Sequence, residues 1–403
     1  MNKNNPNQAN FGFMLYLAGL SMLGFLAIDM YLPAFSIMQQ QLNTSANTIS
    51  ASLSLFLCGF AFAQLSWGPL SDRIGRKPVL LIGLSLFIIS CLATLWITNG
   101  TQLLIVRFIQ GVGVCSTAVI WQALVIDRFS GQYAKRVFAT IMPLVALSPA
   151  LAPLLGAWLL TGNNWQMIFF ALAIIGILLF LATILLQEKK YSEKTDKIKS
   201  TTTFITFLHS AIFSGNVLIY AACSAGFFAW LTGSPFILTQ MGYDPQDIGV
   251  SYVPQTIAFM FGGYGGRYLI AKIKNQILLP IILIGYGISV FVIFILAIYS
   301  QPNLFALLLP FCCMAAMNGA CYPIVVSNAL SVFPQDSGKA AALQNTLQLG
   351  LCFAASLAVS SLIANPLLAT SGVMVATIIP LLIGYWLQNR KASINTKSGA
   401  FEQ

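Results

Sequence analysis

The segment Gly68-Pro-Leu-Ser-Asp-Arg-Ile-Gly-Arg-Lys77 lies between two long apolar stretches, at residues 47–69 and 78–98. Each stretch has the roughly 20 residues that a helix needs to cross a bilayer. Four residues of the intervening segment are charged, and charges are costly in hydrocarbon. The segment is therefore predicted to be a short polar loop that joins two membrane helices.

The same alternation of apolar runs and polar gaps extends along the chain. Of the 403 residues, 58% are hydrophobic and 7% are charged, against about 25% charged in a soluble domain. This composition indicates a membrane protein with many spans. We expect twelve membrane helices, near residues 11–38, 47–69, 78–98, 102–126, 137–160, 165–186, 215–239, 247–270, 277–299, 304–330, 338–363 and 367–388.

The basic residues are confined to alternate gaps between these runs. The formal net charge is +10, which by itself would suit a nucleic-acid-binding protein. Lysine and arginine concentrate in cytoplasmic loops of membrane proteins, so the alternation explains the excess without a nucleic-acid partner. It predicts a multi-pass protein with both termini in the cytoplasm. The expected location is a bacterial cytoplasmic (inner) membrane.

The longest polar segment divides the predicted helices into six and six. It contains the run EKKYSEKTDKIKS and shows no apolar periodicity, so we expect a flexible linker. The basic gap after the eighth run, Gly262–Lys274, weakly repeats the one after the second. The predicted fold is all-α, with 12 transmembrane helices in two pseudo-symmetric six-helix bundles. The predicted parts are an N-terminal tail (1–10), a first bundle (11–186), a linker (187–210), a second bundle (211–389) and a C-terminal tail (390–403).

Two charged residues, Asp29 and Arg107, fall inside the apolar runs and away from their ends. Ionisable residues at such positions usually mark a functional site. Counting residues along each helix places both in the same, external half of the bilayer. If they face each other, protonation of Asp29 would release Arg107, giving two states that a proton can bias. A static ion pair, or an arginine that reaches toward the membrane surface, are the alternatives.

The opening segment carries a recognisable pattern. It matches G-x-L-x-D-R-x-G-R-K at each fixed position and resembles the loop signature of the major facilitator superfamily. The resemblance implies that Asp72 lies near the N-terminus of a helix in the other half, where the helix dipole favours a carboxylate. It also implies a latch on the cytoplasmic gate; the alternative is a basic loop that only sets topology. The gate residues would be Gly68, Asp72, Arg73, Gly75, Arg76 and Lys77.

Three further segments strengthen this resemblance. Arg107-Phe-Ile-Gln-Gly-Val-Gly113 is similar to the superfamily signature R-x-x-Q-G-x-G, whose arginine is tied to proton coupling. Asp29-Met-Tyr-Leu-Pro33 resembles the Bcr/CflA branch of drug/proton antiporters, where an acid here is a proton and substrate site. The run around Pro149, Pro153 and Gly156 resembles an antiporter signature, although Ser148, Ala152 and Ala157 replace its glycines; we expect a helix hinge there.

The predicted function is proton-coupled secondary transport of small organic solutes by alternating access, with drug or metabolite efflux by antiport as the family expectation. Runs in the second half resemble the branch member associated with purine nucleoside transport, which is the alternative. Amide and aromatic side chains in the spans suit a base, although interhelical hydrogen bonds and interfacial aromatic residues are equally usual roles. The candidates are Tyr31, Gln110, Trp121, Gln122, Trp230, Tyr252, Gln255, Asn318, Tyr322, Gln344, Asn345 and Gln348.

Other functional classes find little support in the sequence. The spans contain no His/Cys/Glu cluster, no nucleophile and base pair and no phosphate-binding loop, so an enzyme or an ATP-driven pump is not expected. A channel or a solute sensor remains a rival. We expect no metal and no cofactor. The expected partners are a small-molecule substrate, protons and membrane lipid, and we expect a monomer.

Overall fold

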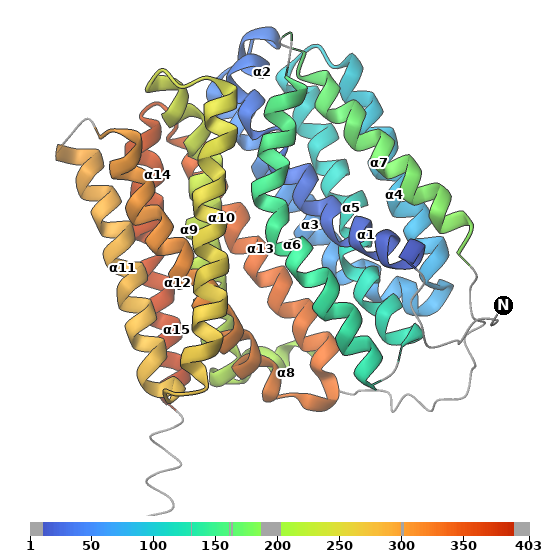
Figure 1. The fold of residues 1–403 in the computed structure, drawn as a ribbon, viewed down its shortest axis with the longest axis vertical. Helices are drawn as coiled ribbons and strands as arrows, with labels where there is room; N and C mark the ends of the chain where they lie inside the picture. The colour runs from blue at the N-terminus through green and yellow to red at the C-terminus, as the bar shows by residue number, and fades with distance from the viewer. Residues whose placement is uncertain are drawn as a thin grey trace, which may run out of the picture. The chain divides into compact units, whose positions relative to one another are not determined.

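The computed structural model describes residues 11–129, 131–160, 162, 164–186, 203–299 and 302–390, and this part of the chain is helical without strands. The predicted N-terminal tail (1–10), residues 187–202 of the predicted linker and residues 391–403 of the predicted C-terminal tail lie outside the described residues. The helices in Figure 1 are α1 (Phe11–Asp29), η1 (Leu32–Ala34), α2 (Phe35–Gln41), α3 (Ala46–Ile74), α4 (Arg76–Ala93), η2 (Thr94–Trp96), α5 (Gly100–Arg128), α6 (Gly131–Leu159), α7 (Gln166–Ile184), α8 (Phe204–His209), α9 (Ala211–Gln240), α10 (Pro245–Ile270), α11 (Asn275–Tyr299), α12 (Leu304–Ser331), η3 (Pro334–Asp336), α13 (Ser337–Ser361), α14 (Pro366–Ala376) and α15 (Ile378–Arg390).

These helices correspond to the twelve predicted spans. Among the described residues, eleven helical stretches are long and apolar enough to cross a membrane. Three of them combine consecutive helices: Phe11–Gln41 from α1 to α2, Arg76–Trp96 from α4 to η2, and Pro366–Arg390 from α14 to α15. The predicted span at 247–270 forms α10, which has 26 residues but is not among the eleven. Its five glycines and its polar residues make it less apolar than its neighbours.

The chain forms two compact units, which are described separately below. The first comprises Met1–Glu193 and Asp244–Val253, and the second comprises Lys194–Tyr243 and Pro254–Gln403. The first unit therefore holds α1 to α7, and the second holds α8, α9 and α11 to α15. The helix α10 is divided between them, with its first residues clustering with the first unit.

Glycines bring the backbones of α3 and α5 into contact in the first unit. A Cβ atom at Gly59 would collide with the carbonyl oxygen of Phe108, and one at Gly111 with the carbonyl oxygen of Phe56. Small residues allow such close crossings in membranes, where packing replaces the hydrophobic effect as the driving force. This contact fixes α5, the helix that carries Arg107, against α3.

The second unit uses the same arrangement where α10 crosses α12. A Cβ atom at Gly262 would collide with the carbonyl oxygen of Ala316, and one at Gly319 with that of Phe259. Helix α9 packs against α12, α13, α14 and α15 and is the centre of this unit. Because both crossings pair the second and fourth spans of their bundle, they reproduce the predicted internal repeat.

The end of the predicted linker is a short helix and not an extended segment. In α8, Phe207 is fully buried, and its ring contacts those of Phe213 at 5.8 Å and Phe333 at 4.6 Å between centroids. The last residues of the predicted linker therefore form a packed helix, because the charged run ends before an apolar stretch whose Phe207 packs into the core. His209, the last residue of α8, is exposed, and its Nδ1 lies 2.8 Å from the carbonyl oxygen of Ile205.

Candidate functional site

Arg107 is fully buried in the first unit, on α5. Its Nη1 donates a hydrogen bond to Gln110 Oε1 at 2.7 Å, and its Nη2 donates to the carbonyl oxygen of Ala27 at 3.1 Å. The Gln110 interaction follows from the three-residue spacing, which places both side chains on one face of the helix. The second interaction joins α5 to α1 through the backbone.

Aromatic rings surround the same guanidinium group. Its Cζ lies 4.1 Å from the ring centroid of Tyr31 and 4.4 Å from that of Phe56, with Phe169 at 5.9 Å. The faces of aromatic rings attract cations through their quadrupole, most strongly away from water. The Tyr31 hydroxyl is itself hydrogen-bonded to Ser52 Oγ at 3.1 Å. The Arg107 charge is therefore balanced by ring faces and neutral oxygens.

Both the oxygen and the nitrogen of the Gln110 amide form hydrogen bonds. Its Nε2 donates to Thr94 Oγ1 at 3.0 Å, while its Oε1 accepts from Arg107. Thr94 in turn donates to the carbonyl oxygen of Ser90 at 2.8 Å. This chain of hydrogen bonds orients the amide oxygen toward the guanidinium group. Gln110, predicted as a substrate-cavity residue, is thus an orienting partner of Arg107 in this structure.

Asp29 is the last residue of α1 and is 3% exposed. Its Oδ1 has no hydrogen-bond partner among the described residues, and neither does Nε of Arg107. No ion pair joins Asp29 to Arg107 in the described part of the chain. The facing arrangement considered from the sequence is thus absent here, because Arg107 binds the α1 backbone at Ala27, about half a helical turn before Asp29.

The end of α1 lies directly against α6. A Cβ atom at Gly156 would collide with the carbonyl oxygen of Met30, the residue after Asp29. Pro153 is buried and Pro149 is half-buried on the same helix. Because a side chain at position 156 would displace Met30, this glycine fixes the position of Asp29. The predicted hinge at these three positions stays a prediction.

The segment 68–77, predicted as a loop, is mostly helical: residues 68–74 end α3, Gly75 alone forms the turn, and Arg76 and Lys77 begin α4. Gly75 has φ of 99° and lies between the two helices, a conformation that glycine adopts at no steric cost. Arg76 forms ion pairs of 2.9 Å with Asp72 and 2.9 Å with Asp127. Lys77 donates to the carbonyl oxygens of Ile184 at 2.6 Å and Leu186 at 3.0 Å. Through these contacts, the turn joins the ends of α3, α4, α5 and α7.

Asp127 is a residue that the sequence reasoning missed. It lies one residue before the end of α5, and its Oδ2 accepts from Arg76 Nε. The available signal was an isolated acid at the start of a gap that is otherwise basic, with Arg128, Lys135 and Arg136 following. Of the other predicted gate residues, Arg73 is exposed and Gly68 has room for a side chain.

The remaining substrate-cavity candidates of the first unit do not gather at one place. Tyr31 belongs to the Arg107 cluster. Trp121 is buried, with its ring edge-on to that of Phe138 at 5.4 Å between centroids, whereas Gln122 is exposed. Tyr252 is buried on α10. Packing contacts therefore account for Trp121, and Gln122 points away from the core.

The candidates of the second unit lie around α9. The ring of Trp230 stacks on that of Phe311 at 4.5 Å between centroids. Asn318 donates to the carbonyl oxygen of Cys223 at 3.2 Å, and the Tyr322 hydroxyl accepts from Ser224 at 3.0 Å. Asn345 and Gln348 are half-buried. The buried amide oxygens without a hydrogen-bond partner among the described residues include those of Gln255, Asn318 and Gln344.

Comparison with solved structures identifies the architecture. The chain is similar to the D-xylose-proton symporter, with a TM-score of 0.75 and 16% identity, covering 92% of this chain and 96% of that one. A bacterial homologue of the human lysosomal transporter Spinster gives a TM-score of 0.72 and 14% identity, covering 93% and 95%. At these identities the likeness establishes the fold alone.

Comparison with sequence relatives identifies the family of the chain. It is 26% identical over 398 residues to a bicyclomycin resistance protein homologue of Haemophilus influenzae, covering 96% of this chain and 98% of the relative. It is 34% identical over 315 residues to the uncharacterised transporter YdgK of Bacillus subtilis, covering 74% and 76%. The multidrug transporter MdfA of Yersinia pestis is 28% identical over 279 residues, covering 68% and 67%. Since residues 17–357 also match the family described as the Major Facilitator Superfamily, the chain belongs to this superfamily of membrane transporters.

Proposed function

We propose that this protein is a proton-coupled antiporter that exports small organic solutes, and that Asp29 is its proton site. The observation that carries the proposal is the buried Asp29 side chain, whose Oδ1 has no hydrogen-bond partner among the described residues. It lies in the same unit as the buried Arg107, which forms no ion pair with a described carboxylate. A charge in such surroundings is expensive unless it is paired. Proton uptake and release at Asp29 would therefore favour different arrangements of α1, as a two-state switch requires.

In this proposal Arg107 is the fixed positive charge that attracts Asp29 when its carboxyl group is deprotonated. It binds α1 through the carbonyl oxygen of Ala27 and is fixed on α5 by Gln110. A deprotonated Asp29 would compete with this carbonyl oxygen for the guanidinium group. A shift of α1 that exchanges one acceptor for the other would then link proton release to helix movement.

The proposed gate is the turn at 68–77. The ion pairs of Arg76 and the cap that Lys77 places on α7 hold four helix ends of the first unit together. This supports a first bundle that moves as one body during alternating access. Following the positive-inside pattern, we assign this end to the cytoplasm, with the protein in the inner membrane.

The proposed cargo is a drug or metabolite, because relatives that match most of the chain are named for drug resistance and multidrug transport. A purine nucleoside is the second candidate. The buried amide oxygens of Gln255, Asn318 and Gln344 have no hydrogen-bond partner among the described residues and favour it, since amides can pair with the edges of a base.

The test is a flux panel with purified protein in liposomes. Labelled nucleosides and lipophilic cations are offered with and without an imposed pH gradient. Cation flux that rises with the gradient would support drug antiport. Saturable nucleoside flux without cation flux would overturn the drug proposal, and flux of either cargo that ignores the gradient would overturn proton coupling.

A further inference from the structure

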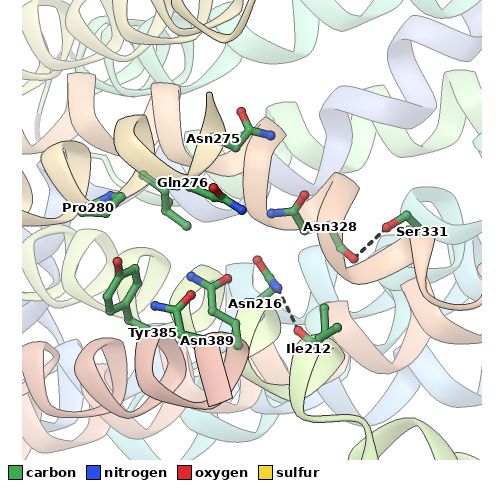
Figure 2. A pocket seen from close by; sticks show the side chains of 11 residues that line it. Ile212, Asn216, Asn275, Gln276, Pro280, Asn328, Ser331, Tyr385 and Asn389 are labelled. Atoms are coloured by element: carbon green, nitrogen blue, oxygen red, sulfur yellow. Dashed lines mark hydrogen bonds between the residues drawn. The ribbon is translucent and has the colours of Figure 1, made fainter. Parts of the chain in front are cut away.

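A pocket opens inside the second unit, between the ends of four helices. It is lined by residues from the start of α9 and α11 and from the end of α12 and α15, and it has a volume of about 240 Å³ (Figure 2). Lys274 immediately precedes its first α11 residue and Arg390 immediately follows its last α15 residue. The pocket therefore lies at the basic end of the bundle. It uses none of the residues assigned above to proton coupling or to substrate.

Carboxamides dominate the lining of this pocket. In Figure 2, Asn275, Gln276 and Asn328 lie on one side and Asn216 and Asn389 on the other. Gln388 supplies a sixth amide. Each amide offers both a hydrogen-bond donor and an acceptor. None of the described residues that line the pocket is charged, so it offers no counter-ion for an ionic ligand.

Asn216 shows that part of this polarity is not satisfied by the described residues. It is 1% exposed, and its Nδ2 donates to the carbonyl oxygen of Ile212 at 2.8 Å. Its Oδ1 is buried and has no hydrogen-bond partner among the described residues. A buried, unpaired amide oxygen costs about 1–3 kcal/mol. Because this oxygen is buried, a ligand donor reaches it only with a small movement of the pocket wall, and the hydrogen bond would then recover that free energy.

The pocket also has an apolar side and a limited size. Leu279 and Pro280 of α11 and the ring of Tyr385 of α15 line it together with the amides. Flat ligands pack against such surfaces while their edges reach polar groups. The volume lies below the about 300–1,000 Å³ of typical ligand sites, so a single ring system suits it better than a drug-sized molecule.

From these observations, we propose that the pocket binds a small, flat, neutral molecule with donors and acceptors on its edge, such as a nucleobase or an aromatic carboxamide. Such a ligand would contact α9, α11, α12 and α15 at once and restrain their movement relative to one another. The proposal is independent of the transport function proposed above, because it rests on a pocket formed by the second unit alone.

The experiment measures binding to the full-length protein purified in detergent. Adenine and nicotinamide are the flat, neutral probes, glucose is a neutral probe that is not flat, and tetramethylammonium is the ionic probe. Binding is followed by calorimetry and by the rise of Tm with ligand concentration. At least one flat probe should bind, while glucose and tetramethylammonium should not.

Three variants assign the binding to this pocket. Asn216→Leu and Gln276→Met should each weaken binding of the flat probe by about tenfold, the loss expected for a removed hydrogen bond. Gln276 is exposed, so its replacement tests the pocket even where Asn216→Leu does not fold. Gln240→Met changes an exposed amide at the opposite end of α9 and should leave binding unchanged. Failure of both flat probes to bind, binding of glucose or tetramethylammonium instead, or equal weakening by all three variants would overturn the proposal.

Discussion

The two units share a scaffold but differ in what they bury. Both cross their second and fourth spans through glycines that touch the opposite backbone. The first unit buries Asp29 and Arg107, whereas no buried residue described in the second unit is charged. The second buries neutral groups instead, such as the Thr232 and Ser356 hydroxyls, which are 2.8 Å apart. The architecture thus occurs twice, while among the described residues only the first copy buries charged groups.

The largest expected effect comes from removing the acid of the first unit. Asp29→Asn should abolish transport driven by a pH gradient, by at least about a hundredfold, because the amide cannot exchange a proton. Exchange of substrate across the membrane without a gradient should persist. The measurement is labelled flux in liposomes, with Asp247→Asn, an exposed acid of α10, as the control. Gradient-driven flux by Asp29→Asn at the wild-type level would remove the functional difference between the units.

Changing the buried cation while keeping its charge should have the next largest effect. Arg107→Lys retains one positive charge but loses the planar group that binds Gln110 and Ala27 and stacks on Tyr31. We expect a loss of about 2–3 kcal/mol in stability, the worth of a hydrogen bond to a charged group. Thermal unfolding would measure it. The matched control is Arg128→Lys, whose exposed guanidinium lies over Phe13; an equal shift in both variants would contradict a special role for the Arg107 cluster.

The shared scaffold can be tested with one substitution in each unit. Gly111→Ala and Gly319→Ala each place a methyl group against a backbone carbonyl, at Phe56 and at Phe259. Each should cost about 1–3 kcal/mol, as overpacking does in tight cores. Gly350→Ala, where a Cβ atom meets nothing within 4 Å, should instead be neutral or stabilise by up to about 1 kcal/mol. Thermal unfolding of the three variants decides; a tolerated Gly319→Ala beside a damaging Gly111→Ala would break the structural parallel.

The smallest expected effect concerns the turn at 68–77. The Arg76 and Asp127 side chains are 15% and 31% exposed, and ion pairs at such positions contribute about 0–1 kcal/mol. Asp127→Asn should therefore change stability by less than about 1 kcal/mol. A double-mutant cycle with Arg76→Ala measures the coupling between the two. A coupling above about 2 kcal/mol would show that this pair does more than join helix ends.

Much of this organisation could be predicted from the sequence, because hydrophobic periodicity and charge placement are local signals. The helices, the repeat and the position of Arg107 inside a membrane span follow from such signals. The surroundings of Arg107 do not: Phe56 and Phe169 belong to no motif, and they meet only when α3, α5 and α7 pack together. The relation of Asp29 to Arg107 was also beyond residue counting, which gives depth along a helix but not the direction of a side chain.

The hydrogen bond from Arg107 to the carbonyl oxygen of Ala27 has a consequence for how mutations act. A backbone acceptor is present whatever residue occupies position 27, so no single change of side chain in α1 deletes it. The contact depends on the position of the α1 backbone and not on the side chains of α1. Substitutions along α1 should therefore leave the hydrogen bond of Arg107 intact unless they shift the helix itself. A side chain at Gly156, which would displace α1, should disturb this hydrogen bond more than a change in the chemistry of an α1 side chain.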